Sequence, residues 1–533
     1  MDHLAILPVV LPLFAGAALA LIDDRHHNVK LAVNVAATLL LVAVSLLLLA
    51  DVQNGPARIS TYQLGNWPVP YGIVLVLDPL SAMMVALTSV LALGAIIFSA
   101  ARWHRAGQHF NSLFQLLLMG LNGAFLTGDL FNLFVFFEVL LAASYGLALH
   151  GSGKSRVKAS LHYVAVNLAS SSLFLIGATA IYGVAGTLNM ADIAMRAPLL
   201  SPGDQTLLQA GAAILGVAFL VKAGIWPLGM WLPTTYAAAA PPVAAMFAIL
   251  SKLGVYVILR LTSLLFGEGS GAEVHLGAAV LQYGGLATIV FGTIGVLASQ
   301  GVARIACFSV MVSSGTLLAM VGYDDAGVTA GALYYLVSST LGLACLFLLV
   351  ELMERGRSPG DDVLAVTLEA YGDDDDEAEQ TPEAGSATPG TFAALGIAFV
   401  CCAILVAGMP PLSGFLGKFL MIGAMLDTGT AQGEAVSAGV WVTVAILIVS
   451  GLAATIALMR SGINTFWVSL ERVIPAIHGV EIAPIILFLA LALGMTVYAQ
   501  PIMSFMGTAA DALYTHGGYV DAVLADRATG AGR

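Results

Sequence analysis

Long apolar segments separated by short polar loops make up most of the chain. A membrane-spanning helix needs about 20 apolar residues, and about fourteen segments approach that length. They lie near residues 4–22, 31–50, 76–100, 112–128, 130–149, 159–184, 206–231, 240–262, 275–299, 302–322, 328–350, 393–427, 436–459 and 482–505. The sequence lacks the apolar–polar alternation of a lipid-facing β-barrel. The pattern therefore predicts an all-α integral membrane protein with about fourteen transmembrane helices.

The composition agrees with this prediction and excludes an ordinary soluble protein. Hydrophobic residues make up 59% of the chain, charged residues only 10%, and the mean hydropathy is +0.93. The four cysteines do not have the spacing of metal ligands, and no flavin, haem or iron–sulfur motif occurs. We therefore expect no cofactor, no bound metal and no nucleic-acid partner.

Lysine and arginine are unevenly distributed between the loops. If the N-terminus lies outside, the odd-numbered loops contain Arg25, Lys30, Arg102, Arg105, Lys154, Arg156, Lys158, Arg304, Arg355, Arg357, Arg460 and Arg472. The even-numbered loops hold only Arg58 and Arg196, with Arg260 at a helix end. Because positively charged loops stay in the cytoplasm, we expect a multi-pass protein of the cell (plasma) membrane with both termini on the outer face.

Two stretches depart from the apolar pattern. Residues 356–391 are rich in Asp and Glu and end in Pro, Gly and Ser, which predicts a flexible cytoplasmic linker. A calcium or partner-docking site is the alternative interpretation of this acidic run. Residues 460–481 mix aromatic and aliphatic side chains with charges and could lie along the membrane surface as an amphipathic connection.

Four firmly charged side chains interrupt the apolar segments: Glu138, Lys222, Lys252 and Lys418. A charge in the bilayer core costs about 2.5–3.5 kcal/mol on insertion scales, so its default interpretation is functional. One carboxylate and three ammonium groups on different helices indicate a path for protons. The alternatives are a static ion pair for Glu138, snorkelling for Lys222 and helix-interface contacts for Lys252.

Prolines accompany two of these lysines. Pro227 follows Lys222 by five residues, and Pro410 and Pro411 precede Lys418. Because proline interrupts a helix and frees backbone carbonyls, the pattern predicts two discontinuous helices, each with a lysine beside the break. Such a pair in the two halves of a chain is typical of a transporter built from inverted repeats.

Softer polar groups lie between the four charges. Tyr256 is one turn from Lys252 and shares its helix face. We take five residues as candidate supporting members of a proton relay: His162, Tyr256, Ser313, Tyr335 and Ser338. Each hydroxyl taken alone is more often a helix-packing contact. Asp78, followed by proline, and Asp129 are expected to cap helices.

The motifs around these residues resemble the antiporter-like family shared by the membrane arm of respiratory complex I and the Mrp-type multisubunit cation/proton antiporters. The resemblance covers nearly the whole chain and lies in residues 77–81 (L-D-P-L-S), 221–233 (V-K-A-G-I-W-P-L-G-M-W-L-P), 241–243 (P-P-V), 251–256 (S-K-L-G-V-Y) and 410–415 (P-P-L-S-G-F) with Lys418. Within the family, residues 127–138 (T-G-D-L-F-N-L-F-V-F-F-E) are most similar to the D subunit of the Mrp antiporters.

The resemblance implies a fold of fourteen helices with both termini outside and two inverted five-helix repeats. Helices 1–3 would occupy 1–111, the first repeat 112–262, the second repeat 275–459, and the last helix with its connection and tail 460–533. The family's membrane glutamate falls on Glu138, and its three membrane lysines fall on Lys222, Lys252 and Lys418.

Four positions depart from the family pattern. Histidines common in relatives are replaced here by Gly229, Ser313 and Ser338, and a lysine of some relatives is Leu343. The central relay therefore has fewer groups that titrate near neutral pH. Either water and hydroxyls carry protons across this region, or the chain transmits coupling to a partner subunit.

We therefore expect a proton-translocating subunit of a Na⁺ (monovalent cation)/H⁺ antiporter, a secondary transporter subunit rather than an enzyme, which works with other membrane subunits in the lipid bilayer. The alternative is a proton-pumping membrane subunit of a complex I-like NADH dehydrogenase or membrane-bound hydrogenase. That subunit would use the same residues without exchanging cations. A structural scaffold is a third interpretation.

Overall fold

A computed structural model of the chain describes residues 3–23, 25–54, 58–265, 277–355, 389–431, 436–466 and 477–530. Within these ranges the chain is helical apart from its loops and one antiparallel hairpin, in which β1 (Ser60–Gln63) pairs with β2 (Val74–Leu77). Most of the predicted acidic linker, 356–391, and part of the predicted amphipathic stretch, 460–481, lie outside the described residues.

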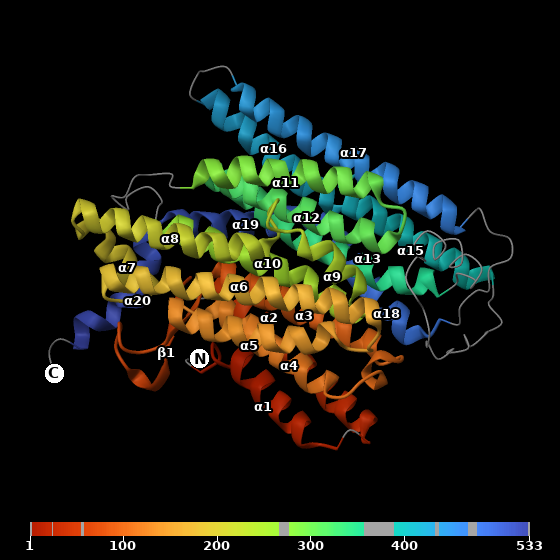
Figure 1. The fold of residues 1–533 in the computed structure, drawn as a ribbon. Helices are drawn as coiled ribbons and strands as arrows, with labels where there is room; N and C mark the ends of the chain where they lie inside the picture. Colours follow the sequence, from red (N-terminus) through yellow and green to blue (C-terminus); the bar gives the residue numbers. More distant parts are fainter. Residues whose placement is uncertain are drawn as a thin grey trace.

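The helices run side by side in one bundle, with α1 at one edge and α16 and α17 at the opposite edge (Figure 1). In chain order they are α1 (Leu7–Leu21), α2 (His27–Asn54), α3 (Pro79–Ser99), α4 (Phe110–Leu126), α5 (Leu130–Ala148), α6 (Lys154–Ala185), α7 (Met190–Arg196), α8 (Pro202–Ala223), α9 (Trp231–Ala238), α10 (Pro241–Leu265), α11 (Ala278–Ala298), α12 (Val302–Val321), α13 (Ala326–Glu354), α15 (Pro389–Ala407), α16 (Ser413–Ala431), α17 (Ala438–Phe466), α18 (Gly479–Val497), α19 (Ala499–Tyr514) and α20 (His516–Gly530).

Among the described residues, 11 helices are long and apolar enough to cross a membrane, and α1, α4 and residues 392–407 of α15 form shorter apolar helices. The prediction of a helical multi-pass membrane protein is therefore confirmed. The number of fourteen spans, the boundaries of the two repeats and the orientation of the termini stay predictions.

Two helices form the interior of the bundle. In α10 a stretch of 18 consecutive residues is completely buried, and in α13 94% of an 18-residue stretch is buried. Over these stretches other helices, and not lipid, cover the surfaces of α10 and α13. The helices packed around α10 include α3, α8, α12 and α13, so any charge on α10 lies inside protein and not against lipid.

Capping residues set the starts of two helices as predicted. The Asp78 carboxylate accepts a hydrogen bond from the Ser81 amide at 2.8 Å, and Ser81 Oγ accepts one from the Asp78 amide, which completes a capping box at α3. Asp129 accepts a hydrogen bond from the Asn132 amide at the start of α5.

Both predicted helix breaks are present, but glycine and not proline ends the helices. α8 stops at Ala223, where Gly224 takes a φ of 79°, and α15 stops at Ala407, where Gly408 takes a φ of 72°. A left-handed residue at this position is the ordinary end of a helix, and glycine adopts it without strain. Pro227, Pro410 and Pro411 lie in the connections that follow. The predicted segments 206–231 and 393–427 are therefore each divided.

Close packing of α8 on α10 depends on Gly254. A Cβ atom there would lie 2.7 Å from the Ala223 nitrogen and from the Phe219 carbonyl oxygen, both of which are backbone atoms that have no rotamer to change. We expect Gly254→Ala to lower the free energy of unfolding by about 1–3 kcal/mol, because the two helices must separate. The measurement is the temperature at which half of the solubilised protein is lost.

Gly216→Ala is the matched control, because no atom of the protein lies within 4 Å of the position that a methyl group on this glycine of α8 would take. There the same substitution should be neutral or should stabilise the helix by up to about 1 kcal/mol. Equal midpoints for the two variants would contradict the packing argument.

Candidate functional site

Glu138 and Lys222 both contact α6, which lies between them. Ser171 on α6 donates a hydrogen bond to Glu138 Oε1 of α5. Lys222 Nζ of α8 donates one to Asn167 Oδ1, 3.2 Å away and one turn before Ser171 on α6. Among the described ion pairs there is no direct contact between Glu138 and Lys222. The carboxylate and the ammonium group therefore have separate polar partners, one turn apart on α6.

Aromatic rings complete the surroundings of Lys222. Its ammonium nitrogen lies 5.3 Å from the centre of the Phe137 ring and 5.5 Å from that of Tyr163. The faces of aromatic rings attract an ammonium group electrostatically. Lys222 is only 1% exposed, whereas Glu138 is half-buried. The carboxylate is therefore the member of this group nearer to the protein surface.

Lys252 lies in the interior and contacts hydroxyl groups. Its Nζ donates hydrogen bonds to Ser313 Oγ at 2.8 Å and to Ser314 Oγ at 3.2 Å, both on α12. Ser313 Oγ in turn donates to Ser339 Oγ of α13 at 3.0 Å. Lys252 is fully buried. These contacts place an ammonium group at one end of a line of hydroxyls that crosses from α10 through α12 to α13.

Lys418 uses the second helix break. Its Nζ donates a hydrogen bond to the carbonyl oxygen of Ala407, the last residue of α15, at 3.0 Å. Gly408 leaves room for the lysine, since a Cβ atom there would lie 2.9 Å from Lys418 Cε. Ser413, the first residue of α16, shares a 2.8 Å hydrogen bond with Ser338 of α13. At this break, therefore, the Lys418 ammonium group contacts the end of α15, and a serine hydroxyl of α13 contacts the start of α16.

The other proposed relay residues differ in position. Tyr335 is buried on α13, one turn before Ser339. His162 is exposed on α6 and takes part in none of the hydrogen bonds of the row described above. The Tyr256 hydroxyl donates to the carbonyl oxygen of Phe125 at 2.5 Å, away from Lys252. The structure therefore brings Ser313, Ser338 and Tyr335 close to the buried lysines, but not His162.

The structure explains why position 229 has no side chain, one of the four departures from the expected family pattern. A Cβ atom at this position would lie 2.2 Å from the carbonyl oxygen of Gly224, so the backbone in this break leaves no space for a side chain. Ser313 and Ser338, where the resemblance leads us to expect histidine, carry hydroxyl groups that take part in hydrogen bonds. Leu343 is buried and adds no polar group.

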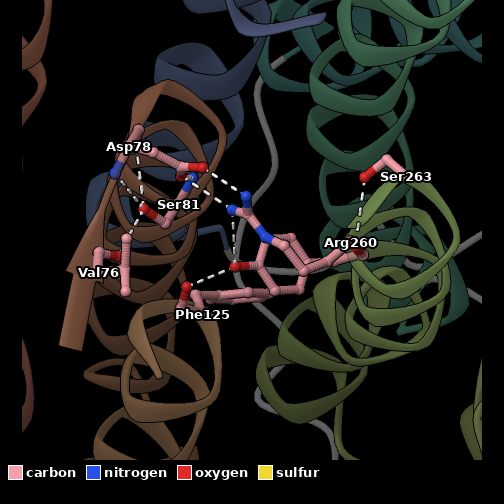
Figure 2. A network of polar contacts seen from close by, with 7 residues as sticks. Val76, Asp78, Ser81, Phe125, Arg260 and Ser263 are labelled. Atoms are coloured by element: carbon pink, nitrogen blue, oxygen red, sulfur yellow. Dashed lines mark hydrogen bonds and ion pairs between the residues drawn. The ribbon is translucent and has the colours of Figure 1, made fainter. Parts of the chain in front are cut away.

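One pair of charged residues was not singled out from the sequence. Arg260 of α10 makes two hydrogen bonds to the Asp78 carboxylate, at 2.5 and 2.9 Å, and a third to the Tyr256 hydroxyl at 3.3 Å (Figure 2). Asp78 was predicted only as a helix cap, and Arg260 only as a residue at a helix end. The available signal was spacing, because Arg260 follows Lys252 by two turns on the same helix face.

The described residues contain no group of three or more His, Cys, Asp or Glu side chains placed to hold a metal ion. The row from Glu138 to Lys418 instead consists of ammonium, hydroxyl, amide and carboxylate groups, and hydrogen bonds link some neighbouring members of it. Such groups can pass protons when their hydrogen bonds rearrange, provided that a buried charge finds a partner at each position.

Known proteins similar to this chain share its length and its fold. The family model "NADH:quinone oxidoreductase/Mrp antiporter, TM" matches residues 127–444. A probable K⁺/H⁺ antiporter D subunit of Rhizobium meliloti is 57% identical over 96% of both chains. The Na⁺/H⁺ antiporter D subunit of Alkalihalophilus pseudofirmus is 33% identical over 98% of this chain and 100% of its own. A chain of the Mrp complex from Dietzia sp. superposes with a TM-score of 0.81 at 26% identity, over 98% of this chain and 100% of that one.

The hydroxyl contacts of Lys252 allow a test of this geometry. Replacing both Ser313 and Ser314 by alanine leaves a buried ammonium group without its two hydrogen-bond acceptors. We expect a loss of about 1–3 kcal/mol in the free energy of unfolding, measured as a lower midpoint of thermal loss. Ser309→Ala on the same helix is the control, because that hydroxyl donates only to the carbonyl of Ile305 within α12. A double variant as stable as the control would contradict the assigned contacts.

Proposed function

The chain belongs to the NADH:quinone oxidoreductase/Mrp antiporter family, and on this basis we propose that it is the proton-translocating D subunit of a multisubunit monovalent cation/proton antiporter. The observation that carries the proposal is the row of buried ammonium groups on α8, α10 and α16, with Glu138 at one end. Charges are retained in a membrane interior when they have a function there, because their insertion is costly.

The half-buried Glu138 is the proton acceptor of the row. When it takes up a proton, its negative charge disappears, and the attraction that stabilises the ammonium form of Lys222 weakens. Lys222 then releases a proton toward Lys252. Ser171 and Asn167 are the hydrogen-bond partners of the two groups, so that the coupling between Glu138 and Lys222 is electrostatic and does not require a closed ion pair.

Hydroxyl groups connect the later part of the row. Lys252 contacts Ser313, Ser313 contacts Ser339, and the adjacent residue Ser338 contacts Ser413 at the break beside Lys418. Hydroxyls do not hold an excess proton at neutral pH, but they order water that conducts one. Ser313 and Ser338 can therefore support proton conduction through ordered water, although this chain lacks the histidines that we expect in relatives at these positions.

The cation binds elsewhere in the complex. One carboxylate against three ammonium groups makes a positively charged row, whereas Na⁺ and K⁺ require oxygen ligands. The relative at 57% identity is named for K⁺ and the one at 33% for Na⁺, so K⁺ is the first cation to test even though the sequence motifs suggested Na⁺. Other membrane subunits of the antiporter are the partners, and they supply the cation path.

A short motif common to the two helix breaks supports the proposed fourteen-helix arrangement with two inverted repeats, within 112–262 and 275–459. Both breaks read Ala-Gly-x-x-Pro-Leu, at 223–228 and at 407–412. In both, the capping glycine donates to the carbonyls three and four residues before it, Leu220 with Val221 and Ile404 with Leu405. Shared sequence and shared hydrogen bonding favour a common origin of the two breaks. Both termini lie on the outer face in this arrangement.

Glu138→Gln tests the function. The amide keeps the shape of the side chain and removes its charge, so we expect K⁺- and Na⁺-driven proton movement to fall about 100-fold or more, with the complex still assembled. The measurement is cation-driven proton flux in vesicles from an antiporter-deficient host that expresses the full native gene set.

Glu354→Gln is the matched control, since this glutamate is exposed at the end of α13. It should leave the flux unchanged. Wild-type flux from Glu138→Gln would remove α5 from the transport path. A wild-type complex that moves no protons with any cation, and that co-purifies with redox subunits, would favour the respiratory pump.

A further inference from the structure

The ion pair between Asp78 and Arg260 lies inside the protein. Asp78 is 3% exposed and Arg260 6% exposed, and the guanidinium group contacts both carboxylate oxygens (Figure 2). Two ring centres flank the guanidinium carbon, Tyr256 at 5.5 Å and Tyr519 of α20 at 5.2 Å. A pair that is desolvated to this degree interacts strongly, and removal of either partner leaves the other charge uncompensated.

Arg260 is close enough to Lys252 along α10 for its charge to affect proton binding by the lysine. Lys252, Tyr256 and Arg260 follow one another at four-residue intervals and therefore share one face of α10. Eight residues of helix correspond to about 12 Å. Two positive charges at that distance, at the effective dielectric constant of about 20 found for protein interiors, would alter a proton-binding equilibrium by about one pH unit.

We propose that Asp78 is a positioning residue for proton transport, which neutralises Arg260 so that Lys252 can accept a proton at physiological pH. This inference rests on the proposed function, in which Lys252 is a proton carrier. Asp78 does not touch the transported proton. It acts through Arg260, and its carboxylate is held in place by the capping box at the start of α3.

The inference concerns the field at Lys252, to which other groups also contribute. The charged and titratable side chains on the helices packed around α10, capping residues included, are Asp78 (α3), His109 (α4), Asp192 and Arg196 (α7), Asp204 and Lys222 (α8), Tyr236 (α9), Arg304 and Cys307 (α12), Asp325, Tyr334, Tyr335, Cys345, Glu351, Glu354 and Arg355 (α13), and Tyr498, Asp511 and Tyr514 (α19), together with Tyr519 of α20 beside Arg260. Of all these, only Asp78 forms an ion pair with a residue on the Lys252 face of α10 among the described contacts.

Three variants separate an electrostatic role from a mechanical one. Asp78→Asn keeps a good helix cap and leaves Arg260 charged, so the alkaline limb of the pH profile for cation-driven proton flux should move by about one unit to lower pH. Arg260→Met leaves the Asp78 charge, and the limb should move to higher pH. The double variant Asp78→Asn/Arg260→Met should return the limb to the wild-type position, because both charges are gone.

A pair that only fastens α3 to α10 gives a different result. The flux of all three variants would then fall in proportion to the amount of assembled complex, with no shift of the limb, and that outcome overturns the inference. If a single variant fails to assemble, Arg260→Lys decides, because it keeps the charge and loses the two-pronged geometry. An assembled Arg260→Lys complex with wild-type flux and an unshifted limb supports the electrostatic role, because the charge then suffices without the two-pronged geometry. Lost flux from an assembled Arg260→Lys complex overturns it.

Lys252→Met, measured in the same vesicles, distinguishes failure of this inference from failure of the proposed function. Lost flux in Lys252→Met with unshifted limbs in the pair variants overturns the inference alone. Wild-type flux and profile in Lys252→Met would remove Lys252 from the transport path and overturn both.

Discussion

The need to give every buried charge a polar partner governs this structure. In a membrane interior no bulk water is available, so an ammonium group must find oxygen atoms within the protein. The three buried lysines solve this problem in three ways. Lys222 uses a side-chain amide on α6, Lys252 two hydroxyls on α12, and Lys418 a backbone carbonyl. Contacts with α6, α12 and the second helix break therefore supply the oxygen atoms that the three ammonium groups need.

A helix break is a source of partners as well as an interruption. Because α15 ends before Gly408, the last carbonyl groups of the helix have no amide donor within it. The carbonyl oxygen of Ala407 accepts a hydrogen bond from Lys418 instead. The close approach of lysine to glycine is possible because position 408 carries no methyl group, which would collide with the lysine. The break thus creates both the space and the oxygen atom that a buried ammonium group needs.

The buried charges and the helix breaks can be located from the sequence, but the hydrogen-bond partners of the charges cannot. Hydrophobic length identified the spans, and the rarity of charge within them identified Glu138 and the three lysines. The partner of each lysine depends on which helices become neighbours, and no short-range pattern contains that information. The sequence predicts that Pro227 interrupts the helix, whereas Gly224 ends α8, because a left-handed glycine terminates the helix before the proline is reached.

The missed pair illustrates the same limit. Asp78 fits a cap in every local respect, and it is one, but its carboxylate also pairs with an arginine 182 positions away in the sequence. His162 shows the converse, since its residue type suggested a relay while its helix face turns outward. Residue type indicates what a side chain can do, and tertiary neighbours determine whether it does it.

The burial of α10 has a consequence for how the protein is made. Synthesis proceeds from the N-terminus, so α3 with Asp78 is made before α10, and the counter-ion of Arg260 exists when Arg260 is added to the chain. The hydroxyls that bind Lys252 belong to α12, which is synthesised later. During that interval Lys252 has no partner on α12. Of the helices packed on α10, α3 and α8 are then present, and α12 and α13 are still to be made. The order of the helices in the gene is thus also an order in which buried charges are satisfied.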